Sequence, residues 1–220
     1  MNCLFTLNIC NKQGFNGPFI TDRVRRSFVA ACLRWGCNYA EINHEPGFEG
    51  AKICNWGKLL GPKYLVGYDK LLYLDGDMII SEHAPNPFDL CVKEDVMYAV
   101  TDAQGNNPNE TWFHCIYGAE VGKITARFPT FSQPQPERYF NSGFMLFYNT
   151  PKIRETFDEI LANRDLEAPT CYDQTVINMF VHNRMWVELL PTEWNYIVWG
   201  RPASDTAHIN HFAHAGPSLA

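Results

Sequence analysis

The segment Asp75-Gly76-Asp77 contains the residues best suited to chemistry in this sequence. It directly follows an apolar run at residues 70–74 that is typical of a buried strand, and α/β proteins bind ligands at the carboxyl ends of such strands. Two carboxylates separated by one glycine can both reach a single divalent cation, and that cation can bind phosphate oxygens. The segment is therefore a candidate metal site, with a solvated Asp-Gly turn as the competing interpretation.

Three histidines near the C-terminus supply further candidate ligands: His208, His211 and His214. Imidazole is a common ligand of ions similar to Mn²⁺ and Zn²⁺. On an extended strand, His208 and His214 would face one side and His211 the other, so all three could bind one ion only if the strand bends. An isolated histidine is more often an ordinary surface or core residue, but for this cluster we expect at least one metal ligand.

The composition describes a folded protein without a large basic surface. The chain has 220 residues, 46% of them hydrophobic, and its 18 basic and 24 acidic residues give a net charge of −6. Disorder is excluded, and binding to nucleic acid or anionic lipid is disfavoured because no polybasic segment is present. An anionic substrate would then need a metal ion to neutralise it. The 8 cysteines are scattered without a CxxC pair, which disfavours a zinc knuckle or a redox motif.

The sequence contains no candidate segment for membrane insertion or export. Its longest apolar runs are far shorter than the roughly 18 residues that span a bilayer. The first residues lack the basic segment of a signal peptide, so we expect a cytoplasmic protein. No repeat or low-complexity tract divides the chain, and we expect a single domain over residues 1–220.

Strand-like and helix-like segments alternate along the chain. Strands are predicted by short apolar runs at residues 4–9, 39–42, 70–74, 96–100, 143–148 and 186–190. Helices are predicted by apolar spacing and capping residues at about residues 21–35, around 56–66, from Thr150-Pro151 onward and from near Asp173. The segment 104–138 is rich in Asn, Gly, Pro and Gln, and we expect a loop over a site. The alternation predicts an α/β fold with a mostly parallel central sheet.

Five segments, in order along the chain, resemble the motifs of one enzyme family. They contain Leu74-Asp75-Gly76-Asp77, Phe140-Asn141-Ser142-Gly143, Asp173-Gln174 with Asn178, Leu190-Pro191 with Asn195, and His211-Phe212. The chain thereby resembles GT-A glycosyltransferases of the glycogenin and lipopolysaccharide galactosyltransferase type. The resemblance implies a single GT-A, Rossmann-like nucleotide-diphospho-sugar transferase domain. It also implies a nucleotide-binding half at about residues 1–102 and an acceptor-side half at about 103–220, in a module that longer polypeptides can contain.

The resemblance implies a metal-dependent transfer of a sugar from a UDP-sugar, such as UDP-glucose, to a glycan or other hydroxyl acceptor. The divalent ion, Mn²⁺ or Mg²⁺, would be held by Asp75, Asp77 and His211, and would stabilise the charge on the departing UDP. The residues implied to bind the donor lie at the end of the first strand, in the following helix region, in the DxD turn and beside the donor sugar: Thr6, Leu7, Asn8, Lys58, Gly76, Asn141 and Ser142.

The catalytic residues implied by the resemblance are Gln174, Asp173 and Asp102. Gln174 would orient the transient oxocarbenium ion, with Asp173 as the alternative, and Asp102 would hold hydroxyls of the donor sugar. Such enzymes retain the anomeric configuration, which requires no strong general base, because a phosphate oxygen can accept the acceptor proton. Ordinary roles compete with two assignments: Asp173 could cap its helix, and Lys58 could be an exposed helix lysine.

The C-terminal segment departs from the family pattern. Family members usually continue as His-x-x-Gly-x-x-Lys-Pro-Trp, whereas here Gly216 comes two residues late and no lysine follows. His211 is the preferred metal ligand because it follows a strand-like pair of residues as in the family, and His214 is its rival. The missing lysine leaves open a catalytically inactive sugar-nucleotide or glycan-binding module on the same fold. A haloacid-dehalogenase-like phosphatase is a lesser alternative, because its downstream Gly-Asp motif is absent from this sequence.

Overall fold

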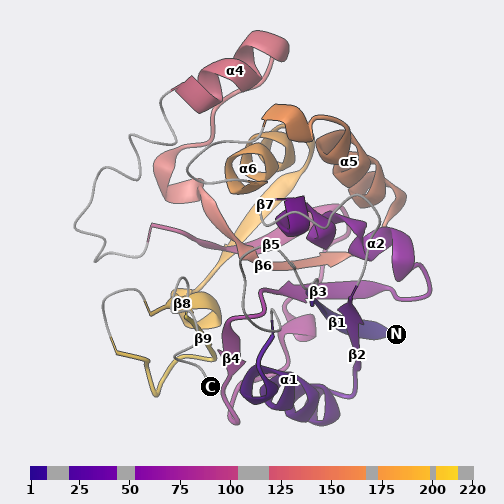
Figure 1. Ribbon diagram of the computed structural model, residues 1–220, viewed down its shortest axis with the longest axis vertical. Helices are drawn as coiled ribbons and strands as arrows, with labels where there is room; N and C mark the ends of the chain where they lie inside the picture. The colour runs from indigo at the N-terminus through magenta and orange to yellow at the C-terminus, as the bar shows by residue number, and fades with distance from the viewer. Residues whose placement is uncertain (9–19, 44–52, 104–118, 167–172, 199–201, 213–220) are drawn as a thin grey trace.

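The computed structural model describes residues 1–8, 20–43, 53–103, 119–166, 173–198 and 202–212. Most of them belong to a central β-sheet flanked by helices on both faces (Figure 1). No helix in these described ranges combines the length and the apolar character needed to cross a bilayer.

The main sheet has six strands in the order β2-β1-β3-β6-β5-β7. Their bounds are β1 Asn2–Leu7, β2 Asn38–Ile42, β3 Lys70–Leu74, β5 Val96–Thr101, β6 Phe140–Tyr148 and β7 Trp186–Leu190. Strand β6 runs antiparallel to both of its neighbours, β3 and β5, whereas the other three pairings are parallel. The predicted α/β fold is confirmed. The sheet is mixed, because β6 runs in the opposite direction to the other strands.

Helices cover both faces of this sheet, and each face has its own apolar core (Figure 1). Helix α1 (Asp22–Trp35) packs on one face, while α2 (Gly61–Tyr64), α5 (Pro151–Ala162) and α6 (Asp173–Arg184) pack on the other. Adjacent residues of a strand therefore enter different cores, as Leu4 and Phe5 of β1 do. Strands buried on both faces read as continuous apolar runs, which is why they could be predicted.

The two longest predicted helices begin where their capping residues indicate. Thr21 accepts a hydrogen bond from the Val24 amide at the start of α1, and Thr150 accepts one from the Ile153 amide at the start of α5. These bonds satisfy amides that have no partner within the helix. Gly36 ends α1 with φ 63°, a left-handed conformation that glycine adopts without strain.

Two predictions of local structure were wrong in detail. The segment predicted as a helix around 56–66 is a 3-10 helix, Ile53–Leu60, followed by the single turn α2, because Pro62 lacks an amide hydrogen and starts a new turn. The segment predicted as a loop over 104–138 contains helix α4 (Ala119–Arg127) and a 3-10 turn, Pro136–Arg138; residues 104–118 lie outside the described part of the chain. Its apolar residues Val121 and Ile124 are buried, and this burial holds α4 in place.

A second, three-stranded sheet joins the C-terminal region to the segment after the DxD turn. It has the order β4-β9-β8, with β4 Met78–Ile80, β8 Tyr196–Ile197 and β9 Ile209–His211. Strand β4 pairs antiparallel with β9, and Met78 lies opposite His211. The pairing brings a histidine more than a hundred residues away next to Asp77. The remaining short elements are the 3-10 helices Pro87–Asp89, Arg164–Leu166 and Thr192–Asn195.

Candidate active site

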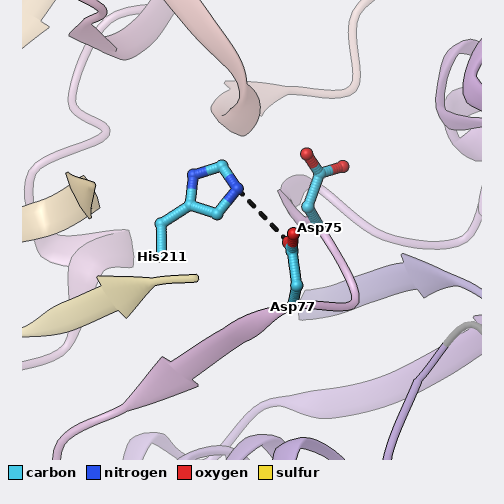
Figure 2. A group of neighbouring side chains, drawn as sticks. All are labelled: Asp75, Asp77 and His211. Atoms are coloured by element: carbon cyan, nitrogen blue, oxygen red, sulfur yellow. Dashed lines mark ion pairs between the residues drawn. The ribbon is translucent and has the colours of Figure 1, made fainter. Parts of the chain in front are cut away.

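The DxD turn connects β3 to β4 at the carboxyl end of β3. The Asp75 amide donates to the Gly143 carbonyl of β6 at 2.9 Å, which continues the antiparallel pairing one residue past the strand. Asp75, Asp77 and His211 each offer one ligand atom, and these atoms lie within 4.8 Å of one another. Figure 2 shows the two carboxylates rising from the turn and the imidazole approaching from β9. Gly76 is the buried residue between them.

His211 is buried and faces the carboxylates. Its Nε2 lies 3.2 Å from Oδ1 of Asp77, the ion pair drawn in Figure 2. Burial lowers the pKa of His211, but the neighbouring carboxylates, led by Asp77, raise it by more, so the net shift is upward. The same negative field that favours a proton on this ring also favours a metal cation.

Gly143 leaves the space that this cluster needs. A Cβ atom at Gly143 would lie 2.6 Å from Oδ2 of Asp75 and 3.0 Å from Cε1 of His211, both too close for ordinary contact. Only glycine lets the backbone of β6 approach the two side chains so closely.

The chemistry of the three side chains fits a divalent cation. Carboxylate oxygens suit Mg²⁺ and Mn²⁺, whereas imidazole suits the transition metals, and Mn²⁺ accepts both kinds of ligand. The three ligand atoms converge from the DxD turn and from β9, and Gly143 keeps the space beside them open, so the residues fit the metal that the sequence led us to expect.

Lys58 lies beside the cluster and is buried, which excludes an exposed helix lysine. Its Nζ lies 2.9 Å from Oδ2 of Asp173 and 3.8 Å from Oδ1 of Asp75, and it donates to the Ser142 hydroxyl at 3.2 Å. A buried ammonium group requires such partners to replace its hydration. The lysine therefore joins the DxD turn to the start of α6.

A second cluster of polar side chains lies just after β5, at the start of β6 and at the start of α6. Asn141 donates to Oδ1 of Asp102 at 2.9 Å, and Gln174 donates to Oδ2 of the same carboxylate at 3.3 Å. Oε1 of Gln174 accepts from the Ser142 amide at 3.0 Å. These bonds fix the side chains of the residues expected to surround the donor sugar, and Asp173 begins α6 one residue before Gln174.

At the end of β1, the side chains of the residues expected to bind the donor already contact neighbouring parts of the protein. The Thr6 hydroxyl donates to the Leu74 carbonyl at 2.6 Å, Leu7 is buried in the core, and Asn8 donates to Glu41 at 2.8 Å. A ligand could therefore reach Thr6 and Leu7 through the backbone rather than the side chains. Strand β1 ends at Leu7, before the predicted limit, and Ile9 lies outside the described residues.

Of the other candidate histidines, His208 packs edge-on against Trp194, with ring centroids 4.6 Å apart, and does not belong to the Asp75 cluster. His214 lies outside the described residues.

Two residues that contact the cluster were not predicted. The buried phenol of Tyr73 donates to Oδ1 of Asp75 at 2.5 Å. Burial and the Asp75 charge raise the pKa of Tyr73 well above its usual value, so the phenol remains a donor. Asn195 contacts His211 with Oδ1 3.0 Å from Nδ1. The Tyr-x-Asp spacing of a strand, which puts both side chains on one face, could have identified Tyr73.

Solved structures with this fold are glycosyltransferases. A glycosyltransferase involved in glycosylation of the major capsid of PBCV-1 superposes with TM-score 0.64 and 12% identity, over 97% of this chain and 93% of that chain. The galactosyltransferase LgtC, solved with donor and acceptor sugar analogs, superposes with TM-score 0.55 and 16% identity, over 97% of this chain and 87% of its own. The fold is therefore the GT-A glycosyltransferase fold, with a possible Asp-Asp-His metal site.

Sequence comparison identifies the family. The sequence model of glycosyl transferase family 8 matches residues 19–215. The chain belongs to this family. Among curated relatives, galactinol synthase 2 of Ajuga reptans is 27% identical over 81% of this chain, and galactinol synthase 2 of Solanum lycopersicum is 26% identical over 74%. The matched region spans 61% and 48% of these two relatives.

Proposed function

We propose that this glycosyltransferase moves a sugar from a UDP-sugar to a hydroxyl acceptor with the help of Mn²⁺ or Mg²⁺. The observation that carries the proposal is the convergence of Asp75, Asp77 and His211 at the end of β3. This cluster adjoins the polar groups of Asp102 and Gln174, where a donor sugar can be bound. A nucleotide diphosphate and its sugar need these two regions side by side.

The three cluster residues would hold the metal ion, which when bound would neutralise the diphosphate and the charge that develops as UDP departs. Lys58 adds a second positive charge, since its ammonium lies between the carboxylates of Asp75 and Asp173. Thr6, Leu7 and Asn8 end the strand beside β3, and we assign the uridine to this position.

Asp102, Asn141 and Ser142 are the proposed ligands of the donor-sugar hydroxyls. Asp102 can accept hydrogen bonds from hydroxyls, and Asn141 fixes its orientation. We assign Gln174 to the vicinity of the anomeric carbon, with Asp173 as the alternative, because both begin α6 beside this carboxylate. An amide at that position can orient a transient cation without forming a covalent bond, which is compatible with retention of configuration.

The donor sugar and the acceptor are best sought by assay. The names of the curated relatives make galactinol synthesis one activity to test. A panel of UDP-sugars, with UDP-glucose and UDP-galactose among them, should be screened for slow hydrolysis with and without Mn²⁺, because hydrolysis requires no added acceptor. NMR of the first product formed would then give its configuration, and an inverted product would contradict retention.

Asp77→Asn provides the decisive variant, because it removes one anionic metal ligand. Turnover and Mn²⁺-dependent UDP binding should both be lost, whereas Asp158→Asn, the same change on the exposed side of α5, should retain both. UDP binding that is independent of Mn²⁺ in wild type and variant would contradict the metal role. Metal-dependent binding without turnover of any UDP-sugar would favour the inactive binding module.

A further inference from the structure

We infer that Asn195 is a positioning residue that fixes which nitrogen of His211 is free to bind the metal. Asn195 is fully buried at the end of the 3-10 helix Thr192–Asn195, between β6 and β9. Its side chain contacts Asn141 and His211, and we infer that it acts through these two residues. The inference rests on the proposed function, since it assigns a role at the proposed metal site.

The argument begins at Asn141, whose amide can be oriented in only one way. Its Oδ1 accepts from the Gly143 backbone amide at 3.0 Å, and a backbone N–H can only donate. Its Nδ2 faces Asp102 at 2.9 Å, and an ionised carboxylate can only accept. Both neighbours therefore require the same orientation of the Asn141 amide. Its shape alone would not fix that orientation, because the oxygen and the nitrogen are nearly the same size.

The orientation of Asn141 determines that of Asn195. Because Oδ1 of Asn141 is an acceptor, the atom of Asn195 that lies 3.1 Å from it must be the donor Nδ2. Oδ1 of Asn195 then faces Nδ1 of His211 at 3.0 Å and can only accept a hydrogen from it.

The hydrogen on His211 is therefore assigned to Nδ1. Nε2 faces Asp77 at 3.2 Å, and with Nδ1 holding its own hydrogen, Nε2 is the nitrogen whose hydrogen a metal ion can replace and whose lone pair can then bind it. A histidine ligand whose second nitrogen donates to an amide or carboxylate oxygen is fixed in tautomer and in ring orientation, and loss of that partner typically weakens metal binding 10–100-fold.

The same three bonds connect the metal ligand to the donor-sugar region. They run as one directed series of donors from His211 through Asn195 and Asn141 to the carboxylate of Asp102. Such chains polarise one another in a buried environment, so each bond helps to fix the next. Asn195 thereby links β9 of one sheet to β6 of the other and joins two regions that one donor molecule must contact together.

Two substitutions separate the two hydrogen bonds of Asn195. Asn195→Asp keeps an acceptor for His211 but cannot donate to Asn141, whereas Asn195→Leu, similar in size, loses both bonds. We expect the Leu variant to raise the Kd for Mn²⁺ about 10–100-fold, measured from the electron paramagnetic resonance signal of unbound Mn²⁺. The Asp variant adds a negative charge beside His211, so it should bind Mn²⁺ at least as tightly as the wild type and yet show a higher KM for the donor.

A spectroscopic test follows the hydrogen directly. Long-range ¹H–¹⁵N correlation spectra of metal-free Asp77→Ala, which lacks the carboxylate that competes for a hydrogen on Nε2, should show the hydrogen of the neutral His211 ring on Nδ1. A hydrogen on Nε2, or wild-type Mn²⁺ affinity in a folded Leu variant, would overturn the inference. Absence of Mn²⁺ binding to the wild type would instead contradict the proposed function, while the position of the hydrogen would still test the contacts of Asn195.

Discussion

His211 lies where a proton and a metal cation compete for the same nitrogen. Its removal leaves Asp75 and Asp77, and these two carboxylates with the diphosphate would supply most of the hard oxygen ligands. We therefore expect His211→Ala to raise the Mn²⁺ concentration needed for activity roughly 10–100-fold without abolishing activity. A Mn²⁺ titration of turnover provides the measurement, and His214→Ala should change it much less. The reverse order of the two variants would make His214 the ligand.

His182 provides a prediction about pH. Its Nε2 donates to the Arg138 carbonyl at 2.9 Å, and burial lowers its pKa from 6.5 to about 4. Because the unfolded chain binds the proton more tightly, His182 contributes full stability above about pH 6.5 and loses it as the pH falls towards 4. A shift of the pKa from 6.5 to about 4 corresponds to a loss of about 3 kcal/mol of unfolding free energy when the pH falls from above 6.5 to below 4.

His182→Gln keeps an N–H donor but cannot become protonated, so it should remove this part of the acid sensitivity. Urea unfolding at pH 7 and pH 4.5 should give a loss of unfolding free energy that is smaller in the variant by about 2–3 kcal/mol. An equal loss in both proteins would contradict the assignment.

Residue types and spacing suggested Asp75 and Asp77, the family resemblance suggested His211 as their partner, and the fold brings the three ligand atoms together. The Tyr-x-Asp spacing could also have suggested Tyr73, but Asn195 could not be found in that way. An amide in a turn is common, and the role of Asn195 depends on its contacts with Asn141 and His211, which come from other segments of the chain. The burial of Lys58 has the same origin, because its two acidic neighbours come from β3 and α6.

Strand β6 gives a prediction at the scale of the element. Gly143→Ala inserts a methyl group within 3 Å of Asp75 and Asn141, and the strand cannot move away without losing its pairing to β3 and β5. We expect Mn²⁺ binding to be lost and the protein to be destabilised, by about 1–3 kcal/mol as in other overpacked sites. Isothermal titration with Mn²⁺ and urea unfolding measure the two effects.

Gly122→Ala is the matched control for this substitution. Gly122 lies within α4 and has no heavy atom within 4 Å of the position of a Cβ. Alanine is preferred over glycine in a helix by up to about 1 kcal/mol, so this variant should be slightly stabilised and should bind Mn²⁺ normally. A Gly143→Ala protein that behaves like the control would show that the close approach of β6 is not required.

The sequence did not predict strand β4, helix α4 or the direction of β6, because contacts with other parts of the fold determine them rather than a local pattern. Strand β4 has only three residues, too few for a periodic pattern, and it is held by pairing with β9. Helix α4 contains Gly122 and Thr125, which have low helix propensity and weaken its signal in the sequence, and it is stabilised by packing. The direction of β6 leaves no trace in its apolar pattern, because a strand buried on both faces has the same pattern in either direction.

At the scale of the whole molecule, metal binding should stabilise the fold. A ligand that binds only the native state contributes about 2.7 kcal/mol at 100 times its Kd, and a protein of this size gains roughly 2–4 °C in Tm per kcal/mol. Mn²⁺ together with UDP should therefore raise the Tm by roughly 5–10 °C. Thermal unfolding with each ligand alone and with both gives the comparison. Asp77→Asn should show no gain from Mn²⁺, and an equal gain in that variant would place the ion elsewhere.

Strand β9 comes last in the element order, and this affects when the metal site can form during synthesis. The strands that surround the DxD turn, β1, β3 and β6, have all been synthesised once residue 148 is added, whereas His211 follows more than sixty residues later. Domains fold as their segments emerge, so most of the sheet can form before β9 exists. A nascent chain would thus carry the two carboxylates without their histidine, and tight capture of a metal ion would have to wait until β9 has been made and has paired with β4.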